Sequence, residues 1–212
     1  MKMKINKKIK YSAKCINSIS AGYIVGIDEA GRGPIAGPVS VGVFVTTKNF
    51  SLKLRKIFRG LDDSKKLSEI QREKIFSLIE KSVEKDEVNF SVILVSAKII
   101  DRKGITYAVQ AGIDKGIKKL NLNHKETFVY LDGLLKAPKE FSQETVIKGD
   151  VKIAVISAAS ICAKVIRDRH MKKLAKKYPD YGFEKHKGYG TKEHYRSLLK
   201  HGASSEHRKS YL

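Results

Sequence analysis

The stretch GIDEAGRGPIAGPV, residues 26–39, places an aspartate and a glutamate side by side at the end of an apolar run. The run YIVGID (23–28) predicts a buried strand, and PVSVGVFVT (38–46) predicts a second strand rich in β-branched residues. The connection between them is rich in glycine, which allows the main chain to approach a ligand and to direct its N–H groups toward it. A plain turn that carries a surface arginine is the alternative.

Helices and strands alternate along the rest of the chain. The expected helices are 68–85, 97–103, 104–120, 151–178 and 192–202, and the further expected strands are 88–96, 127–133 and 145–150. Ser68, with Gln71 three residues later, predicts a capping box at the start of the first of these helices. This order predicts an α/β fold with a mixed central β-sheet flanked by α-helices.

The length of 212 residues is enough for one substantial hydrophobic core. We expect residues 1–21 to form a basic, flexible N-terminal tail and residues 22–212 to form a single domain. The domain is expected to end in a small helical segment at about 179–212. With 42% hydrophobic and 31% charged residues, the composition is typical of a soluble globular protein.

The chain is strongly basic, with 43 Lys and Arg residues against 22 Asp and Glu residues and a net charge of +21. A polyanionic partner such as a nucleic acid is one explanation, since each neutralised phosphate releases counterions. Compositional drift that decorates the whole surface with lysine is the other explanation, because most of the basic residues are lysines. The charge is therefore compatible with nucleic acid binding without indicating it alone.

Cys15 and Cys162 are too few and too far apart for a disulfide framework, which is typical of proteins in a reducing compartment. The N-terminus lacks the apolar stretch of a secretory signal, and the apolar segment 153–166 is too short and too interrupted to span a bilayer. We expect a cytoplasmic protein that does not enter a membrane. A lysine-rich leader for an organelle is the alternative.

Four acidic residues each end an apolar or β-rich segment: Asp28, Glu29, Asp132 and Asp150. The ends of neighbouring strands lie about 5 Å apart, so these carboxylates converge if their strands are adjacent. Such a cluster is repulsive unless cations compensate it. Carboxylate oxygens suit Mg²⁺, and a pair of such ions is a common clamp for displacement at phosphorus. The pattern therefore predicts phosphodiester hydrolysis at a two-metal site.

Each acid also has a structural interpretation. Asp132 precedes a glycine, which is a common turn signal, and Asp150 precedes a helix that it could cap. Glu29 should point to the opposite face of the strand from Asp28, so its participation requires the strand to twist or end at that point.

The motif GIDEAGRGPIAGPV resembles the first motif of bacterial ribonuclease HII, the type 2 ribonuclease H. Other blocks resemble that family in the same order: DSKKLS (63–68), YLDG (130–133), IKGD (147–150), SAASICAKVIRDRHM (157–171), HKGYGTKEH (186–194) and HRKSY (207–211). Together they span nearly the whole chain after residue 22. The resemblance implies a ribonuclease H-like fold and a metal-dependent endoribonuclease.

The resemblance also implies roles for single residues. The four acids Asp28, Glu29, Asp132 and Asp150 match those that bind two Mg²⁺ or Mn²⁺ ions in the family. The residues Gly31, Arg32 and Gly33 match the segment whose backbone contacts the ribose 2′-hydroxyl and the adjoining phosphate, and Tyr189 matches the tyrosine that helps to read the RNA-to-DNA junction. A half-buried anchor is the structural alternative for Tyr189.

The long helix 151–178 carries Ser157, Ser160, Lys164 and Arg167 at spacings of three or four residues. These spacings predict a polar, basic stripe suitable for phosphates near the metals, and a solvated helix face is the alternative. Lys65 is expected to contact substrate by the same resemblance and is otherwise a loop lysine.

The chain departs from the family pattern in two places. The residues after Asp150, VKIAV, are more aliphatic than is usual, and only about twenty residues precede the first motif. The second departure favours type 2 over type 3, whose members carry a separate N-terminal substrate-binding domain.

We expect an enzyme that hydrolyses the RNA strand of RNA–DNA hybrids and cuts 5′ to single ribonucleotides in duplex DNA. It would leave 3′-hydroxyl and 5′-phosphate ends and act as a monomer. The alternatives are a type 3 ribonuclease H, a catalytically silent hybrid-binding protein and a generic basic RNA-binding protein.

Overall fold

The computed structural model describes residues 20–61 and 67–212. It contains a five-stranded sheet in the order β3-β2-β1-β4-β5. The strands are β1 (Tyr23–Ala30), β2 (Val39–Thr47), β3 (Val88–Val95), β4 (Thr127–Asp132) and β5 (Ser142–Val146). Strand β2 pairs antiparallel with β1 and β3, whereas β4 pairs parallel with β1 and β5. The predicted mixed sheet is confirmed.

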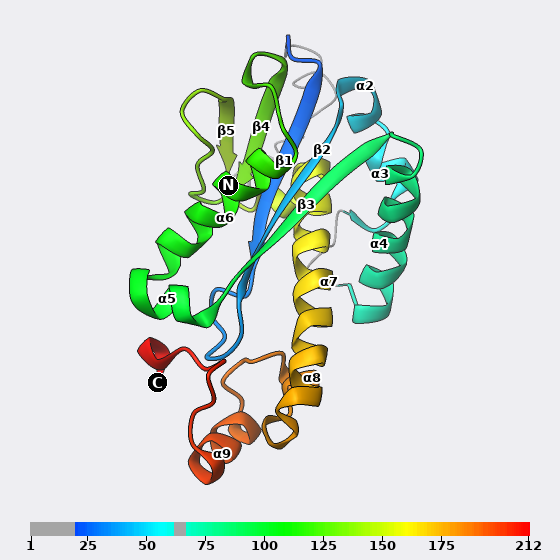
Figure 1. The fold of residues 1–212 in the computed structure, drawn as a ribbon. Coiled ribbons are helices and arrows are strands. Elements are labelled where there is room, and N and C mark those ends of the chain that lie inside the picture. The colour runs from blue at the N-terminus through cyan, green and yellow to red at the C-terminus, as the bar shows by residue number, and fades with distance from the viewer. Residues whose placement is uncertain (1–19, 62–66) are drawn as a thin grey trace, which may run out of the picture.

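Helices connect and cover these strands (Figure 1). The α-helices are α2 (Lys48–Ser51), α3 (Leu54–Ile57), α4 (Glu69–Val83), α5 (Ala97–Lys103), α6 (Ile105–Lys119), α7 (Ala154–Lys177), α8 (Phe183–His186) and α9 (Lys192–His201). Short 3₁₀ helices are η2 (His124–Glu126), η3 (Gly149–Val151), η4 (Pro179–Tyr181) and η5 (Lys209–Tyr211). The capping box expected at the start of α4 is present, since Ser68 and Gln71 bond reciprocally.

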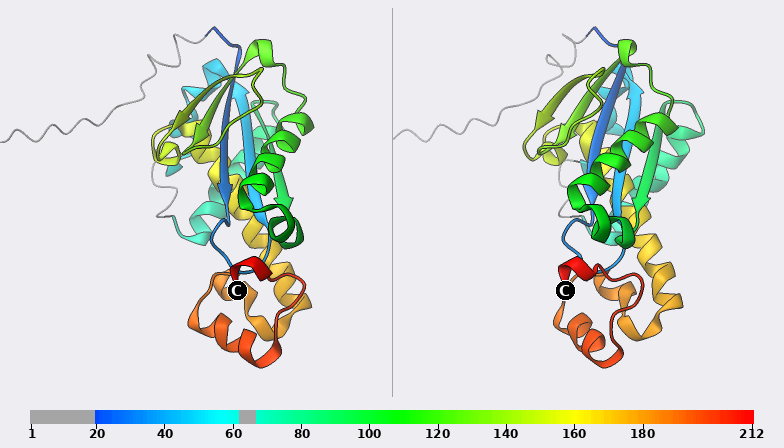
Figure 2. Two further views of the ribbon diagram at one scale, coloured as in Figure 1. Left: turned by 90° about the vertical axis from the view of Figure 1, so that its left-hand side faces the viewer. Right: turned by 60° about the vertical axis from the view of Figure 1, so that its left-hand side comes forward.

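The strands β1, β2 and β4 are largely buried on both faces of the sheet, and Figure 2 shows helices on both sides. Helices α4 and α7 cover one face with a core that includes Ile24 and Phe44, and α5 and α6 cover the other with a core that includes Val25 and Val43. Successive strand residues point to opposite faces, so a sheet with helices on both sides requires apolar residues at consecutive positions. The continuous apolar runs in the sequence follow from this arrangement.

Two strand glycines allow α7 to lie directly against the sheet. A Cβ on Gly26 would lie 2.1 Å from the backbone of Val155, and a Cβ on Gly42 would lie 2.3 Å from the carbonyl oxygen of Ala159. Such contacts exclude any side chain at these positions. The close approach brings the polar residue Ser160 of α7 over the end of β1.

The C-terminal helical segment lies beyond the end of β1, at the bottom of Figure 1. It is joined to the β1–β2 connection by backbone hydrogen bonds from the Ile35 N–H to the Gly188 carbonyl (2.9 Å) and from the Arg208 N–H to the Ile35 carbonyl (2.8 Å). His207 and Ala36 form an isolated β-bridge. The expected C-terminal segment therefore packs on the glycine-rich connection.

The strand expected at 145–150 is wrong in its position, because β5 ends at Val146. Val146 pairs with Asp132, the last residue of β4, so no partner strand continues beyond it. Lys148 then adopts a left-handed conformation with φ of 56°, and the chain turns into η3. Asp150 lies in this 3₁₀ turn and neither ends a strand nor caps α7, whose N-cap is Ile153.

Two predictions fall on residues outside the described part of the chain: the tail at 1–21, apart from its last two residues, and the substrate contact of Lys65. Among residues 20–61 and 67–212, no helix is both long and apolar enough to cross a membrane.

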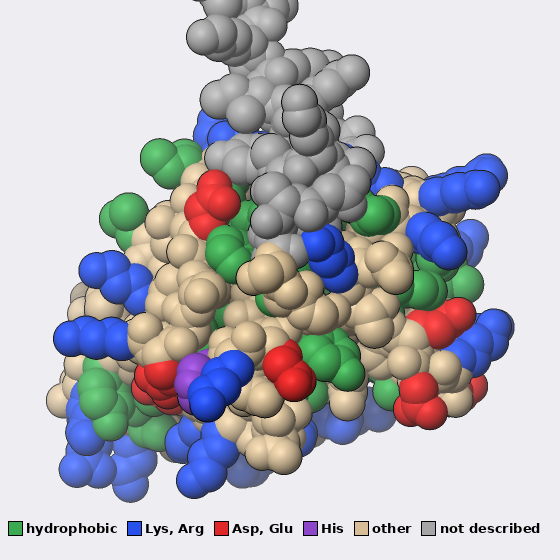
Figure 3. Space-filling view, turned by 90° about the horizontal axis from the view of Figure 1, so that it is seen from above, with side chains coloured by type: hydrophobic (Ala, Val, Ile, Leu, Met, Phe, Trp, Pro, Cys, Tyr) green, Lys and Arg blue, Asp and Glu red, His purple; other side chains and the backbone are tan. Residues whose placement is uncertain are grey.

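On the face shown in Figure 3, Lys and Arg side chains project around the edge, with Asp and Glu among them, and do not gather in one patch.

Candidate active site

Strand β1 carries the first two candidate acids on opposite faces. The Asp28 side chain is buried on the face covered by α7, where it bonds to the side chain of Ser160. Its Oδ1 also accepts a hydrogen bond from the Glu29 N–H at 2.8 Å. Of the two ways in which Glu29 could take part, the one in which the strand ends there is wrong, because β1 pairs with β2 through Ala30. Glu29 nevertheless lies close enough to Asp28 and Asp132 to interact electrostatically with both.

The third acid, Asp132, ends β4 beside β1, since Leu131 is in register with Ile27. Asp132 Oδ1 accepts a hydrogen bond from the Gly149 N–H at 2.6 Å. Asp150, the next residue, is fully buried, and its carbonyl oxygen accepts a hydrogen bond from the Ser157 hydroxyl. The adjacency of β1 and β4 thus brings Asp132 near Asp28 and Glu29, and Asp150 follows the residue that bonds to Asp132.

Burial and mutual repulsion disfavour the charged forms of the two acids on β1. Burial raises the pKa of Asp28 well above its usual value, and the neighbouring Glu29 raises it further. Burial also raises the pKa of Glu29, although Arg32 opposes this effect through an ion pair with an N–O distance of 3.3 Å. In the described residues, no group of three or more His, Cys, Asp or Glu side chains is arranged closely enough to hold a metal ion.

The glycine-rich connection passes directly over α7. Gly31 has a φ of 90°, and a Cβ there would lie 2.1 Å from Nε of Arg167, so the loop depends on glycine at this position for both conformation and space. Arg32 is half-exposed and points to Glu29. Gly33 is exposed, and a Cβ on it would meet no atom within 4 Å.

Two of the acids border hollows at the surface: Glu29 lines both hollows, and Asp132 lines the larger one. One, of about 270 Å³, is lined by Glu29, Ala30, Gly31, Arg72, Ser160, Ile161, Lys164 and Tyr189. The other, of about 540 Å³, is lined by residues that include Glu29, Arg32, Gln110, Asp132 and Lys136. The structure therefore brings eight of the predicted residues around this region: Asp28, Glu29, Gly31, Arg32, Asp132, Ser160, Lys164 and Tyr189.

Tyr189 is 44% exposed and lies on the wall of the smaller hollow. Nζ of Lys164 lies 6.0 Å from the centre of its ring and 2.8 Å from Oδ1 of Asp168. An aromatic face, a cation and glycine backbone therefore border one opening beside the carboxylates. This combination suits a sugar–phosphate chain, because the ring packs on sugar or base and the cation attracts phosphate.

The family model for ribonuclease HII matches residues 25–212. The chain belongs to the ribonuclease HII family. It is 43% identical over 189 residues to ribonuclease HII of Bacillus cereus (strain AH820), an alignment that covers 89% of this chain and 68% of the relative. Ribonuclease HII of Bacillus thuringiensis (strain Al Hakam) matches with the same identity and coverage.

Solved structures confirm the ribonuclease H-like fold. The crystal structure of ribonuclease H2 from Pyrococcus horikoshii OT3 matches with a TM-score of 0.69 and 30% identity over 89% of this chain and 93% of that one. Ribonuclease HII of Archaeoglobus fulgidus, solved in complex with PCNA, matches with a TM-score of 0.71 and 28% identity over 89% and 95% of the two chains. Bst-RNase HIII, at 17% identity and a TM-score of 0.67, shares the fold alone.

The prediction of a polar, basic stripe on α7 is wrong for two of its four residues. Ser157 and Arg167 are fully buried, so they do not form a surface for phosphates. Arg167 donates from Nε to the Pro38 carbonyl at 2.9 Å and from Nη2 to the Ala36 carbonyl at 3.4 Å. Its role is therefore to hold the main chain that follows the glycine-rich loop, which sequence spacing alone could not indicate.

Three buried residues near the loop were not predicted: His194, His207 and Arg208. They contact the glycine-rich loop and Tyr189 from the C-terminal segment. The resemblance of HRKSY to a family block is the signal that could have pointed to two of them.

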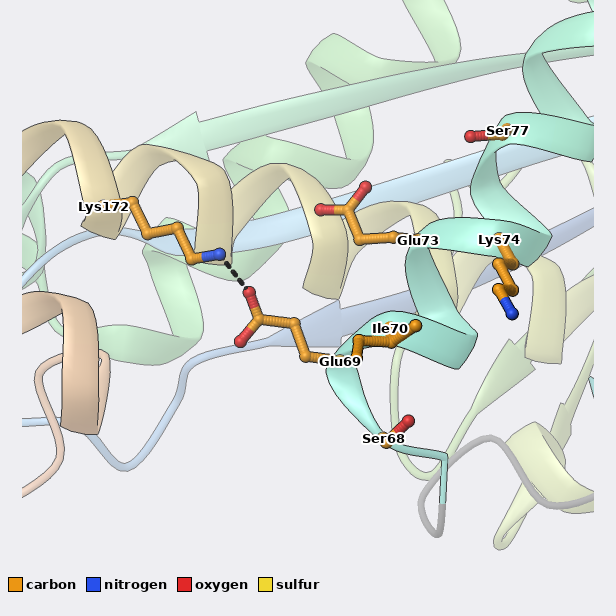
Figure 4. A pocket seen from close by; sticks show the side chains of 7 residues that line it. All are labelled: Ser68, Glu69, Ile70, Glu73, Lys74, Ser77 and Lys172. Atoms are coloured by element: carbon orange, nitrogen blue, oxygen red, sulfur yellow. Dashed lines mark ion pairs between the residues drawn. The ribbon is translucent and has the colours of Figure 1, made fainter.

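A further hollow of about 660 Å³ lies between the first half of α4 and the C-terminal part of α7, lined by Ser68, Glu69, Ile70, Glu73, Lys74, Ser77 and Lys172. Figure 4 shows the ion pair of Lys172 with Glu69 across it. It contains none of the four candidate acids and does not belong to the candidate active site.

Proposed function

We propose that this member of the ribonuclease HII family is an endoribonuclease that hydrolyses the RNA strand of RNA–DNA hybrids and cuts 5′ to single ribonucleotides in duplex DNA. The observation that carries the proposal is the opening bordered by Glu29, Gly31, Lys164 and Tyr189 beside the buried carboxylate of Asp28. The 43% identity to ribonuclease HII of Bacillus cereus supports the same activity.

The candidate acids fit divalent metal ions by the chemistry of their donors. All four offer carboxylate oxygens, the donors that Mg²⁺ and Mn²⁺ prefer. Burial raises the pKa of Asp28 most, and the repulsion from Glu29 that raises it further is the kind that bound cations relieve. Mg²⁺ also needs only one or two protein carboxylates when water and substrate phosphate complete its shell, so a preformed cage of three acids is not required. We propose that Asp28, Glu29, Asp132 and Asp150 hold two such ions.

A pair of bound ions would supply an activated water and stabilise the leaving 3′-oxygen, which gives 3′-hydroxyl and 5′-phosphate ends. The protein residues would position the reacting phosphodiester. Asp28 is fixed by Ser160 and by the backbone of β1, and Asp132 is fixed by the Gly149 N–H. Arg32 keeps Glu29 at the edge of the site through their ion pair.

We propose that the glycine-rich loop and Tyr189 recognise the substrate. The backbone of Gly31, Arg32 and Gly33 would contact the ribose 2′-hydroxyl and its phosphate, because a 2′-hydroxyl is the group that separates RNA from DNA. Tyr189 would pack on the sugar at the RNA-to-DNA junction, and Ser160 and Lys164 would contact the neighbouring phosphate. Lys65 is proposed as a further contact by resemblance alone. We also propose that the protein acts as a monomer in the cytoplasm without entering a membrane.

The test compares three duplexes of one sequence: an RNA–DNA hybrid, a DNA duplex with one ribonucleotide, and all-DNA. We expect cleavage of the first two in Mg²⁺ or Mn²⁺ and of none in chelator, with 3′-hydroxyl products. Cleavage of continuous hybrids alone would instead indicate type 3 behaviour. Binding without cleavage in any metal would indicate a silent hybrid-binding protein.

A further inference from the structure

Arg208, in the C-terminal segment, is fully buried, and its three guanidinium nitrogen atoms donate hydrogen bonds to the glycine-rich loop. It donates from Nη2 to the Gly31 carbonyl at 2.7 Å, from Nη1 to the Arg32 carbonyl at 2.8 Å and from Nε to the Gly37 carbonyl at 2.9 Å. Both ends of the loop are therefore tied to one planar group. Lysine lacks this fork, so it cannot satisfy three carbonyl groups in the same geometry.

The hydrogen bonds from Arg208 also fix the orientation of the peptide groups in the loop. Carbonyl oxygens that accept from a buried guanidinium point inward, and the peptide groups that carry them are then fixed in orientation. Without these donors, the carbonyls of Gly31 and Arg32 would be left without their bonds near the protein interior, which favours rearrangement of the loop.

A chain of neutral histidines holds Tyr189 from the same segment. His194 bonds through Nδ1 to the Tyr189 carbonyl at 2.9 Å and through Nε2 to Nε2 of His207 at 3.0 Å. Nδ1 of His207 accepts from the Ser204 N–H at 3.0 Å. These partners fix the protons: His194 donates from Nδ1, and His207 donates from Nε2 to the lone pair of His194.

His207 and Arg208 are consecutive, and His207 is anchored to Ala36 by a β-bridge. The side chains of these two consecutive residues therefore reach the loop directly, at the Gly31 carbonyl, and reach the Tyr189 carbonyl through His194. We propose that His207 and Arg208 are positioning residues that set the glycine-rich loop and Tyr189 at a fixed spacing for reading the ribonucleotide. This proposal rests on the proposed function, in which those two elements recognise the substrate.

The test uses Arg208→Lys, with Arg169→Lys as its matched control. Arg169 also makes a two-nitrogen fork, to Glu73, but contacts neither the loop nor Tyr189 in any of its described bonds. For duplex DNA with one ribonucleotide, we expect Arg208→Lys to raise KM by roughly tenfold with a smaller effect on kcat, and Arg169→Lys to leave both near wild type. Equal behaviour of the two variants would overturn the assignment.

His207 is tested by His207→Gln against His207→Ala. The glutamine amide can still donate to Nε2 of His194, whereas alanine cannot. We expect the alanine variant to raise KM by roughly tenfold and the glutamine variant to restore most of the loss. An alanine variant with wild-type KM, or a glutamine variant as impaired as alanine, would contradict a positioning role.

Amide hydrogen exchange in the substrate-free protein separates this inference from the proposed function. Arg208→Lys should accelerate exchange at the amides of Gly37 and of residue 208, which bond to the carbonyls of Glu206 and Ile35 between the loop and the C-terminal segment, while amides within β1 and β2 stay protected. Unchanged exchange at the loop, or unfolding of the whole variant, would overturn a local positioning role. If the wild type cleaves no ribonucleotide-containing duplex, the proposed function fails, and exchange still decides whether Arg208 holds the loop.

Discussion

The carboxylate of Asp132 accepts a 2.6 Å hydrogen bond from the backbone N–H of Gly149, so the end of β4 is tied to the turn that buries Asp150. Because of this bond, two substitutions at Asp132 can separate the effect of its charge from the effect of its hydrogen bond. Asparagine retains an oxygen acceptor for the Gly149 N–H without the negative charge, whereas alanine loses both.

We expect Asp132→Asn to keep wild-type stability and to lose activity by roughly a hundredfold or more, because the proposed metal ligand loses its negative charge. Asp132→Ala should lose as much activity and also about 1 kcal/mol of stability, since the Gly149 N–H loses its acceptor. Thermal unfolding and cleavage assays on both variants check this. Full activity in Asp132→Asn would leave Asp132 with only the turn role.

Metal addition should stabilise the wild-type fold. A ligand at about a hundred times its Kd contributes about 2.7 kcal/mol, and each kcal/mol shifts Tm by roughly 2–4 °C in a chain of this size. We expect Mg²⁺ or Mn²⁺ to raise Tm by several degrees over chelator, and Asp28→Asn to lose most of that rise. A rise of equal size in Asp28→Asn would place the ions elsewhere.

The two loop glycines should differ in their tolerance of a side chain. At Gly31, alanine meets Nε of Arg167 at 2.1 Å with φ of 90°, so Gly31→Ala should cost roughly 1–3 kcal/mol of stability. Gly33→Ala has open space and should leave stability within about 0.5 kcal/mol of wild type. Chemical denaturation of the pair measures the difference, and equal stability of both variants would contradict the packing of Gly31 on Arg167.

The histidine chain should weaken as the pH falls. Burial lowers the pKa of His194 to about 4, whereas the pKa in the unfolded state is about 6.5. Between these two pH values the unfolded state binds a proton at His194 that the folded state does not bind, so the free energy of unfolding falls as the pH falls. The contribution of neutral His194 is therefore complete above pH 6.5 and is lost progressively toward pH 4. We expect His194→Gln to lose less stability than wild type over this range in denaturation curves. Parallel curves would show that His194 does not carry the effect.

The sequence predicted the elements that depend on local pattern. Apolar runs located β1 and β4 and therefore Asp28 and Asp132, because strands covered on both faces leave a continuous apolar signal. The end of β5 was missed because it depends on where its neighbour β4 stops. The burial of Arg167 was missed for a similar reason, since its carbonyl partners come from residues 36 and 38, about 130 positions earlier in the chain.

The burial of Arg208 could not be predicted from the sequence around it. It stands in the charged stretch EHRKS (206–210), which is typical of a solvated tail, yet its guanidinium is fully buried against three carbonyl groups. Only the packing of the C-terminal segment on the β1–β2 connection makes those acceptors available.

We propose that Asp28 organises a metal-dependent site for cutting beside a ribonucleotide. The most direct measurement is cleavage of duplex DNA with one embedded ribonucleotide by wild type and Asp28→Asn, in Mg²⁺, in Mn²⁺ and in chelator. We predict cleavage on the 5′ side of the ribonucleotide by wild type with at least one of the two metals, and none by the variant or in chelator. Cleavage by Asp28→Asn or in chelator at the wild-type rate would show that neither Asp28 nor a metal ion is required, and a wild type that cuts in no condition would contradict the proposed activity.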